Sequence, residues 1–499
     1  MPAKKYRKNY LDIVKGLKRV AVQLSQKLKK VNVIGAGFSG IAAATCLQQK
    51  GFDVTVLEKN EMAGGRARKF SAQGFTFDMG PSWYWMPDVF EKYFNRFGKS
   101  VSDYYELKRL NPSYRIYYGK NDFLDIPQMG EGLRQLFEEL EPGSWNKLLR
   151  FLEEGKFKYE IGVNKLVYNP GLKFSELLDW DVIKGAFRLQ IFSSLSSHIR
   201  QYFKNPRIIQ LLEFPVLFLG ATPEKTPALY SLMNYADLEL GTWYPKGGMH
   251  KVVEGMTRLA TDLGVQFMFD SEVKKINING KGIKSLEVNG VEIKSDYVVA
   301  SADYHHIDQH LLPPSHRKYN TQYWDSRLLA PSALIYFVGL NKKLKGLLHH
   351  TLFFDQDFKL HANEIYENPQ WPTMPQFYIS CPSKTDTTVA PEGFENLMIL
   401  MPVAPGLMDT SEIREKYFTQ VIERLEAMLG ESLTSHIVFK RSYAHQDFMN
   451  DYHALKGNAY GLANTLMQTA NLKPSMINPK INNLVYAGQL TVPGPGVPP

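Results

Sequence analysis

Residues 31–40 read VNVIGAGFSG, and this stretch decides the fold of the chain. The apolar run 31–34 predicts a short strand, and the run 41–50, rich in small residues, predicts a helix. The turn between them, predicted to contact a cofactor throughout, consists of Gly35, Ala36, Gly37, Phe38, Ser39 and Gly40. A glycine-rich turn at the start of a helix presents free backbone N–H groups to an anion. The stretch therefore predicts a nucleotide-binding strand–turn–helix unit.

The three glycines of this turn have different tasks. Gly35 permits the tight turn, Gly37 lets the backbone approach a pyrophosphate, and Gly40 lets the helix pack closely on the strand. A second apolar strand is predicted at 54–57 and is followed by Glu58. A carboxylate at this place can accept hydrogen bonds from ribose hydroxyls. The unit is thus a complete dinucleotide fingerprint, which by itself does not separate NAD from FAD.

The residues after the second strand narrow the choice of cofactor. The run 58–70 reads EKNEMAGGRARKF, with Lys59 at its start and the triplet Gly64-Gly65-Arg66 in its middle. Glycines allow close backbone approach, and an arginine can bind a phosphate through two hydrogen bonds. Here the sequence resembles the FAD amine-oxidase superfamily, whose dinucleotide motif continues into a GGR turn on the FAD diphosphate. The resemblance implies FAD as the cofactor.

Four later motifs extend the resemblance over residues 31–499. They are FTFDMGPS at 75–82, YPKGGM at 244–249, DYVVASAD at 296–303 and NLVYAGQLTVPGPGVP at 483–498. These runs resemble phytoene desaturases, carotenoid isomerases and retinol saturases, and GPSWYWMPDVF is most similar to the bacterial phytoene-desaturase branch. The resemblance implies further FAD contacts at Gly80, Pro81, Ser82, Val273, Gly488, Gly496 and Val497.

The resemblance also implies the architecture. We expect an α/β fold in which an FAD-binding Rossmann-type domain, of the glutathione-reductase-like kind, carries an inserted α+β substrate domain. The expected division is a basic amphipathic extension at 1–30, a discontinuous FAD-binding domain at 31–110, 236–304 and 475–499, and a substrate or membrane-facing domain at 111–235 and 305–474. The stretch 131–235 is predicted to be mostly helical and to hold an apolar tunnel.

The positive charge of the chain is confined to its N-terminus. The net charge is +9, and residues 1–30 hold ten Lys or Arg and one acidic residue, so the rest is balanced. A basic groove for nucleic acid is therefore not predicted. Apolar residues recur in the extension at helical spacing, as in helices that lie on anionic membranes. The alternatives are a frayed extension, a start codon placed too far upstream, or a transit peptide.

Several classes of protein are excluded or disfavoured. The two cysteines, Cys46 and Cys381, form neither a disulfide framework nor a redox pair nor a metal site, so a reducing compartment is expected and the disulfide reductases are excluded. No stretch reaches the roughly 18–20 apolar residues of a transmembrane helix. We predict a cytoplasmic, peripheral membrane protein. Without a second GxGxxG motif, electrons are expected to leave to a quinone or oxygen.

The family resemblance implies desaturation of phytoene or a related carotene by hydride transfer to flavin. Trp83, Tyr84 and Trp85 follow the motif at 75–82 and are the aromatic residues expected nearest the flavin ring, and ordinary packing beneath the cofactor is the alternative role for them. Conceivable proton acceptors are Asp303, His305, His306 and Glu213, and the sequence selects none of them. Alternatives are a carotenoid isomerase or ketolase, a retinol saturase, a flavin amine oxidase, or a non-enzymatic flavin scaffold or lipid-binding protein. The sequence does not distinguish a C30 from a C40 substrate.

The C-terminus carries one further expectation. The sequence stops at Pro498-Pro499, within the last flavin motif. In the family this motif runs into a helix that points at the flavin, and proline is favoured at the first position of a helix. We therefore expect a C-terminally truncated form that binds FAD weakly and regains binding when it is extended.

Overall fold

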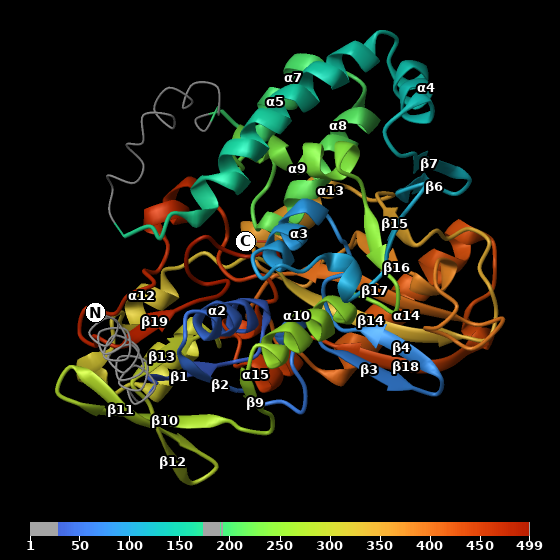
Figure 1. Cartoon of the computed structure of the whole chain (residues 1–499). Coiled ribbons are helices and arrows are strands. Elements are labelled where there is room, and N and C mark those ends of the chain that lie inside the picture. The colour runs from blue at the N-terminus through green and yellow to red at the C-terminus, as the bar shows by residue number, and fades with distance from the viewer. Residues whose placement is uncertain (1–27, 173–189, 191–192, 499) are drawn as a thin grey trace, which may run out of the picture.

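The computed structural model describes residues 28–172, 190 and 193–498 (Figure 1). Most of the basic N-terminal extension predicted at 1–30 lies outside these residues. The described chain is organised around two large sheets, one of five strands and one of seven. In Figure 1 a set of helices that includes α5, α7 and α8 covers the side of the molecule above the two sheets.

The first sheet contains the strand–turn–helix unit of the fingerprint. Its five parallel strands are ordered β19 (Leu484–Tyr486), β13 (Tyr297–Ala300), β1 (Lys30–Ile34), β2 (Asp53–Leu57) and β9 (Gln266–Met268). Two helices pack against each other on this sheet, α2 (Phe38–Gln49) and α10 (His250–Asp262). β1 is central and almost entirely buried, and its sequence is apolar apart from Lys30 and Asn32, as expected for a parallel strand covered on both faces.

A small antiparallel sheet extends this part of the molecule. It consists of β10 (Val273–Asn279), β11 (Gly282–Val288) and β12 (Val291–Lys294). Ile276 and Leu286 join the hydrophobic cluster that also contains Val298 and Leu484 of the first sheet. The short helices α11 (Tyr304–His306) and α12 (Thr321–Asp325) follow in the chain. Three segments far apart in sequence therefore share one core.

The second large sheet is mixed. Its order is β18 (Ile437–Tyr443), β14 (Ser332–Leu340), β17 (Glu395–Val403), β16 (Phe377–Ser380), β15 (His350–Phe353), β6 (Tyr114–Gly119) and β7 (Asp122–Ile126). The pair β15–β6 is parallel and the other pairs are antiparallel. One face packs on α14 (Ser411–Leu429). The other face belongs to the hydrophobic cluster that includes the helical layer.

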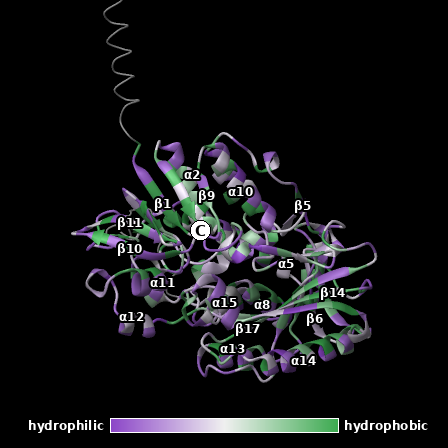
Figure 2. Ribbon diagram, turned by 90° about the horizontal axis from the view of Figure 1, so that it is seen from below, coloured by the Kyte–Doolittle hydropathy of each residue, from purple (hydrophilic) through white to green (hydrophobic). Residues whose placement is uncertain are grey.

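The remaining elements connect these layers. The helices are α3 (Pro87–Asn95), α4 (Glu131–Leu140), α5 (Ser144–Asn164), α7 (Leu195–Tyr202), α8 (Pro206–Glu213), α9 (Leu232–Asn234), α13 (Phe358–Tyr366) and α15 (His445–Tyr452). Two antiparallel pairs complete the fold, the hairpin of β3 (Lys69–Ala72) with β4 (Phe75–Asp78), and the long-range pair of β5 (Leu107–Arg109) with β8 (Trp243–Pro245). Figure 2 shows hydrophobic residues concentrated in inner strands such as β1 and β14, while α13 and α14 carry many hydrophilic residues.

The helical layer contains no membrane-spanning helix within the described ranges. A crossing helix needs about 20 consecutive apolar residues, and no helix among the residues placed here is both long and apolar enough. The longest helix of the described residues, α5, carries both charged and apolar side chains and buries one face only.

Candidate functional site

One large cavity joins the fingerprint to the second sheet. Its volume is about 1180 Å³, and it is lined by residues of both sheets and of the helical layer. Among the residues predicted from sequence, those that line it are Gly35, Gly37, Phe38, Ser39, Glu58, Lys59, Gly64, Gly65, Arg66, Gly80, Pro81, Ser82, Val273, Gly488, Gly496 and Val497. Ala36 and Gly40 lie behind this wall. The structure thus gathers most of the predicted contacts around a single space.

The three turn glycines occupy different environments. Gly35 has a φ of +99°, which favours glycine, and a side chain there would come within 3.1 Å of the Ala302 backbone nitrogen. A Cβ at Gly40 would lie 2.0 Å from the Gly35 carbonyl oxygen, so its role is close packing. A Cβ at Gly37 would meet nothing within 4 Å. Gly37, at the start of α2, therefore borders open cavity.

The Glu58 carboxylate stabilises the fingerprint turn by a hydrogen bond to its backbone. One carboxylate oxygen accepts a hydrogen bond from the Ala36 N–H at 2.7 Å, and the other accepts two from Asn60, each at 2.9 Å. A carboxylate has about four lone-pair positions, so it can accept further hydrogen bonds from a ligand. Because Glu58 also lines the cavity, it both holds the turn and faces a ligand that binds beside it.

A group of polar residues that the sequence did not predict surrounds Lys59. Glu272 accepts a hydrogen bond from His453 Nε2 at 2.8 Å, and Lys59 lies 3.3 Å from the same nitrogen. The ring of His306 stacks on His453 with 3.8 Å between centroids. Burial, together with His453, lowers the pKa of His306 to about 3, so this ring is neutral. These residues come from four distant segments, which is why no local pattern predicts the group.

Arg66 lies half-buried at the cavity wall, next to Gly65, where an added Cβ would lie 3.3 Å from Gly37 Cα of the fingerprint turn. One terminal nitrogen donates to the Asn458 carbonyl at 3.3 Å, and its Nε–H has no hydrogen-bond partner among the described residues. Burial lowers the pKa of Arg66, and the nearby Asp303 opposes this effect. Burial also raises the pKa of Asp303 to about 6. A half-buried guanidinium with a free N–H, near a helix N-terminus and an open backbone position, fits the diphosphate of a dinucleotide.

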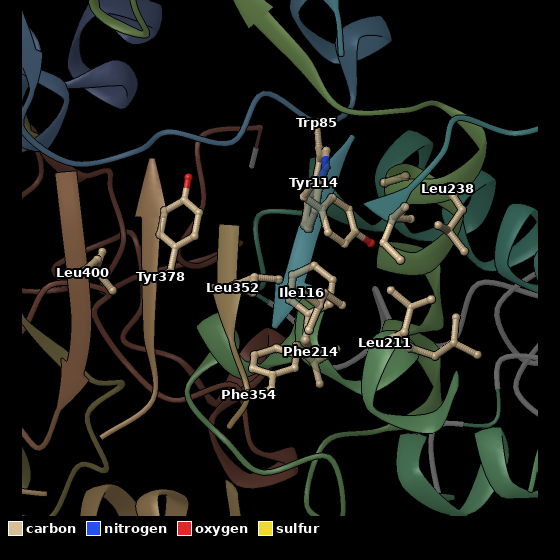
Figure 3. Close-up of a cluster of buried hydrophobic side chains, with 14 of the residues drawn as sticks. Trp85, Tyr114, Ile116, Leu211, Phe214, Leu238, Leu352, Phe354, Tyr378 and Leu400 are labelled. Atoms are coloured by element: carbon tan, nitrogen blue, oxygen red, sulfur yellow. The ribbon is translucent and has the colours of Figure 1, made fainter. Parts of the chain in front are cut away.

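The apolar end of the cavity lies against the second sheet and the helical layer. Ile335, Tyr378 and Leu400 line it from three strands, and Trp83 and Trp85 line it from the loop before α3. Figure 3 shows Tyr378 and Leu400 on neighbouring strands, with Trp85 packed beside Tyr114 and Phe214. Leu229, Tyr230 and Met233 contribute from the helical layer. The tunnel expected within 131–235 is therefore shared between helices and sheet.

The three aromatic residues expected nearest the flavin face different environments in the structure. Trp83 and Trp85 line the cavity, and Trp85 Nε1 donates to Thr242 Oγ1 at 2.8 Å. Tyr84 points into the core of the nucleotide-binding part, where its ring stacks on Phe90 and its hydroxyl lies 3.0 Å from that of Tyr105. The placement expected for Tyr84 is wrong because residues that alternate along an extended segment face opposite sides.

Of the four conceivable proton acceptors, two line the cavity and two do not. Asp303 and His306 line the cavity at its fingerprint end, and Asp303 caps α11 by accepting from the His306 N–H at 3.2 Å. His305 and Glu213 do not line it, and Glu213 forms an ion pair with Arg200. None of these four groups lies at the apolar end.

Comparison with known proteins identifies the family. The family model for flavin containing amine oxidoreductases matches residues 38–494. The chain is 41% identical over 469 residues to a carotenoid 3,4-desaturase from Haloarcula japonica, covering 94% of this chain and 95% of that one. It is 31% identical to a zeta-carotene-forming phytoene desaturase from Myxococcus xanthus, covering 94% and 91% of the two chains.

Solved structures with low sequence identity share the fold. An oxidoreductase from Methanosarcina mazei superimposes with a TM-score of 0.62 at 16% identity, covering 92% of this chain and 94% of that one. A putative protoporphyrinogen oxidase from Exiguobacterium superimposes with a TM-score of 0.59 at 15% identity, covering 95% and 96%. The fold, and FAD as the cofactor inferred from the fingerprint and the GGR turn, are confirmed. The chain belongs to the family of flavin-containing amine oxidoreductases.

Proposed function

We propose that this protein is an FAD-dependent desaturase that introduces a double bond into phytoene or a related long polyisoprenoid. The observation that carries the proposal is the single cavity that joins the dinucleotide fingerprint to a wall of aromatic and aliphatic side chains. Its volume of about 1180 Å³ exceeds the roughly 300–1,000 Å³ of ordinary small-molecule pockets. It therefore suits a dinucleotide together with a long second ligand, and relatives named as carotenoid desaturases support that ligand class.

The proposed FAD contacts follow the geometry of the cavity wall. The N-terminus of α2 with Gly37 would hold the diphosphate, and Arg66 would neutralise part of its charge. Glu58 would bind the ribose, and Val273 would contact the adenine. Gly80, Pro81, Ser82, Gly488, Gly496 and Val497 would complete the wall beside the flavin. When bound, FAD supplies a two-electron acceptor for hydride.

The chain's own residues bind and orient the hydrocarbon. A carotene offers no heteroatom, so its binding comes from burial of apolar surface, worth about 25 cal/mol per Å². Removal of hydride from an allylic carbon leaves positive charge on the substrate. Trp83 and Trp85 line the cavity, and their aromatic rings would stabilise that charge by about 0.5–2 kcal/mol. The same apolar walls exclude water from the reacting carbons.

The proposed substrate domain, at 111–235 and 305–474, meets the membrane where the cavity reaches the surface. Tyr168 and Met467 are 63% and 75% exposed, and Leu172 and Leu472 are also exposed. Tyr168 and Leu472 line the cavity as well. An apolar rim around a hydrophobic passage suits a bilayer surface from which a hydrocarbon enters. We place the protein on the cytoplasmic face of the membrane, with the basic N-terminal extension adding attraction to anionic lipid.

Charging this rim is expected to weaken liposome binding. The double variant Tyr168→Asp/Met467→Asp should bind neutral liposomes at least about tenfold less tightly, since two large side chains no longer bury apolar surface. Met408→Asp is the matched control, because Met408 is 77% exposed and does not line the cavity. Flotation with neutral vesicles measures the difference. Equal binding by the rim variant, the control and the wild type would contradict the proposal that this apolar rim contacts the membrane.

The function itself is tested with a carotene presented in liposomes. Phytoene, or its C30 analogue, should be converted to products that absorb at longer wavelength, because each new conjugated double bond shifts the spectrum to the red. The reaction should need a quinone or oxygen and should proceed without NAD(P)+. An isomerase would change the spectrum without loss of hydrogen, which mass spectrometry detects. A substrate that leaves the assay with its mass unchanged would overturn the proposal.

A further inference from the structure

A chain of buried polar groups passes through the apolar end of the cavity. The Tyr378 hydroxyl, on β16, lies 3.0 Å from Ser82 Oγ and 2.5 Å from His350 Nδ1. Tyr378 and Ser82 line the cavity, whereas His350 is completely buried behind Tyr378 on the next strand, β15. Desolvation makes such groups costly unless they are hydrogen-bonded, as these are to one another. This group therefore differs from the surrounding wall, which consists mainly of aromatic and aliphatic side chains.

His350 is held in place by its neighbours. Its ring stacks face to face on Trp83, with 4.1 Å between centroids and 12° between planes. The ring of His349 contacts it edge-on, at 4.5 Å between centroids. The Nε2 atom of His350 has no hydrogen-bond partner among the described residues. The Tyr378 hydroxyl is thus the partner toward which the imidazole is oriented.

A second, small chamber lies behind Ser82. It has a volume of about 20 Å³ and is lined by Asp78, Ser82, Tyr244, His349 and Ser380, among others. A water molecule needs roughly 10–15 Å³ and two to four polar partners, so this chamber can hold one. Burial raises the pKa of Asp78 to about 6, which makes its carboxylate a better proton acceptor than an exposed one. Ser82 borders both the cavity and this chamber.

We propose that Tyr378 is the catalytic proton acceptor of the desaturation, that His350 positions and polarises it, and that Ser82 leads the proton into the chamber beside Asp78. The inference rests on the proposed function. After hydride has left the substrate, a C–H bond on the neighbouring carbon breaks and its electron pair forms the new C=C bond. The proton goes to the Tyr378 oxygen while the hydroxyl's own proton moves to His350 Nδ1, in the tautomer that carries hydrogen on Nε2.

Burial opposes proton transfer from Tyr378 to His350, and the acidity of the carbocation drives it. Desolvation raises the pKa of Tyr378 and lowers the pKa of His350 well below its ordinary value, so both are neutral at rest. Neutral groups are compatible with an apolar tunnel that must bind a hydrocarbon. The C–H bond beside a carbocation is so acidic that a neutral phenol backed by an imidazole suffices as a base. The His350 imidazolium then passes its proton back to Tyr378. From there a proton moves through Ser82 into the chamber beside Asp78.

The test compares Tyr378→Phe with a matched control on the same sheet. Tyr336 is a buried tyrosine on β14 whose hydroxyl donates to the Arg414 carbonyl at 2.6 Å, on the face that packs on α14. Tyr378→Phe should lower kcat about 10²-fold or more, the usual contribution of a general base. Its KM and FAD content should stay those of the wild type. A hydrated carotene should also appear, because a cation that no base deprotonates would be captured by the water of the chamber behind Ser82.

His350→Phe tests the positioning role while keeping an aromatic ring against Trp83. It should lower kcat with KM unchanged, and Tyr378→Phe/His350→Phe should be no slower than Tyr378→Phe alone, because the two residues act as one unit. A kcat for Tyr378→Phe equal to that of Tyr336→Phe, with no hydrated product, would overturn the relay alone. A wild type that leaves the carotene unchanged would overturn the proposed function and the relay together.

Discussion

Replacement of Gly37 by valine is expected to abolish high-affinity FAD binding and to leave the fold intact. Gly37 has φ −76° and ψ 177°, a conformation open to any residue, and a Cβ there would meet no atom within 4 Å. The side chain would instead occupy the space into which the first N–H groups of α2 point. Loss of two charge-assisted hydrogen bonds, roughly 1.5–3 kcal/mol each, raises Kd about 10²–10⁴-fold.

Gly40→Ala provides the contrast that makes this prediction specific. Its Cβ would lie 2.0 Å from the Gly35 carbonyl oxygen, so the helix and the turn cannot keep their positions. We expect a lower Tm for Gly40→Ala without FAD and an unchanged Tm for Gly37→Val without FAD. Fluorescence titration with FAD and thermal unfolding of the apoprotein measure the two effects. Wild-type affinity for FAD in Gly37→Val would show that the cofactor does not approach this backbone.

Much of the nucleotide-binding part follows from local sequence. The fingerprint, the acidic residue and the GGR turn lie within residues 31–66, so strand, helix and turn patterns suffice to predict them. The runs 297–300, 332–340 and 377–380, which form β13, β14 and β16, can be recognised in the same way. Each is a short run of apolar and β-branched or aromatic residues, the pattern typical of a buried strand.

The missed strands are those whose pairing is distant or whose exposure is mixed. β6 and β15 pair in parallel although more than 200 residues separate them, and β15 begins with His350, a residue type that suggests no strand. β18 lies at the edge of its sheet and carries two exposed charged residues, Lys440 and Arg441, on opposite faces. Tertiary pairing determines such strands, and local propensity does not.

The residues of the candidate site likewise form two sets, one that the sequence predicts and one that it does not. Motif residues beside the fingerprint could be predicted because a nucleotide site is built from a contiguous turn. Tyr378, Leu400 and Ile335 could not, because a side chain that lines a cavity has the same pattern in a strand as one that fills a core. The pair Tyr378 and His350 is brought together by the register of β15 with β16, which the sequence alone does not specify.

Asp237→Asn is expected to remove a pH dependence of stability that the wild type carries. Asp237 is only 2% exposed, and its carboxyl accepts from the Tyr114 hydroxyl at 2.6 Å and from Thr242 Oγ1 at 3.3 Å. Thr242 in turn accepts the indole N–H of Trp85, so this network fixes a wall of the cavity. Burial raises the pKa of Asp237 from 3.8 to about 7.

The sign follows from proton binding in the two states. Between pH 4 and 7 the folded protein binds more protons at Asp237 than the unfolded chain does, so stability falls as pH rises through this window and levels off above it. The full difference corresponds to about 4 kcal/mol. Asn is neutral at every pH and similar in shape. The variant should therefore gain stability relative to the wild type on going from pH 5 to pH 8, by a few kcal/mol.

Urea unfolding at pH 5 and pH 8, followed by circular dichroism, measures this gain. Asp262→Asn is the control, since Asp262 is exposed at the end of α10 and reports only the loss of one surface charge. If Asp237→Asn and the wild type lose stability equally between the two pH values, Asp237 is ionised in the folded protein. Trp85 would then rest on a charged network, and a cavity wall beside a buried carboxylate would bind a hydrocarbon less well than the neutral wall proposed here.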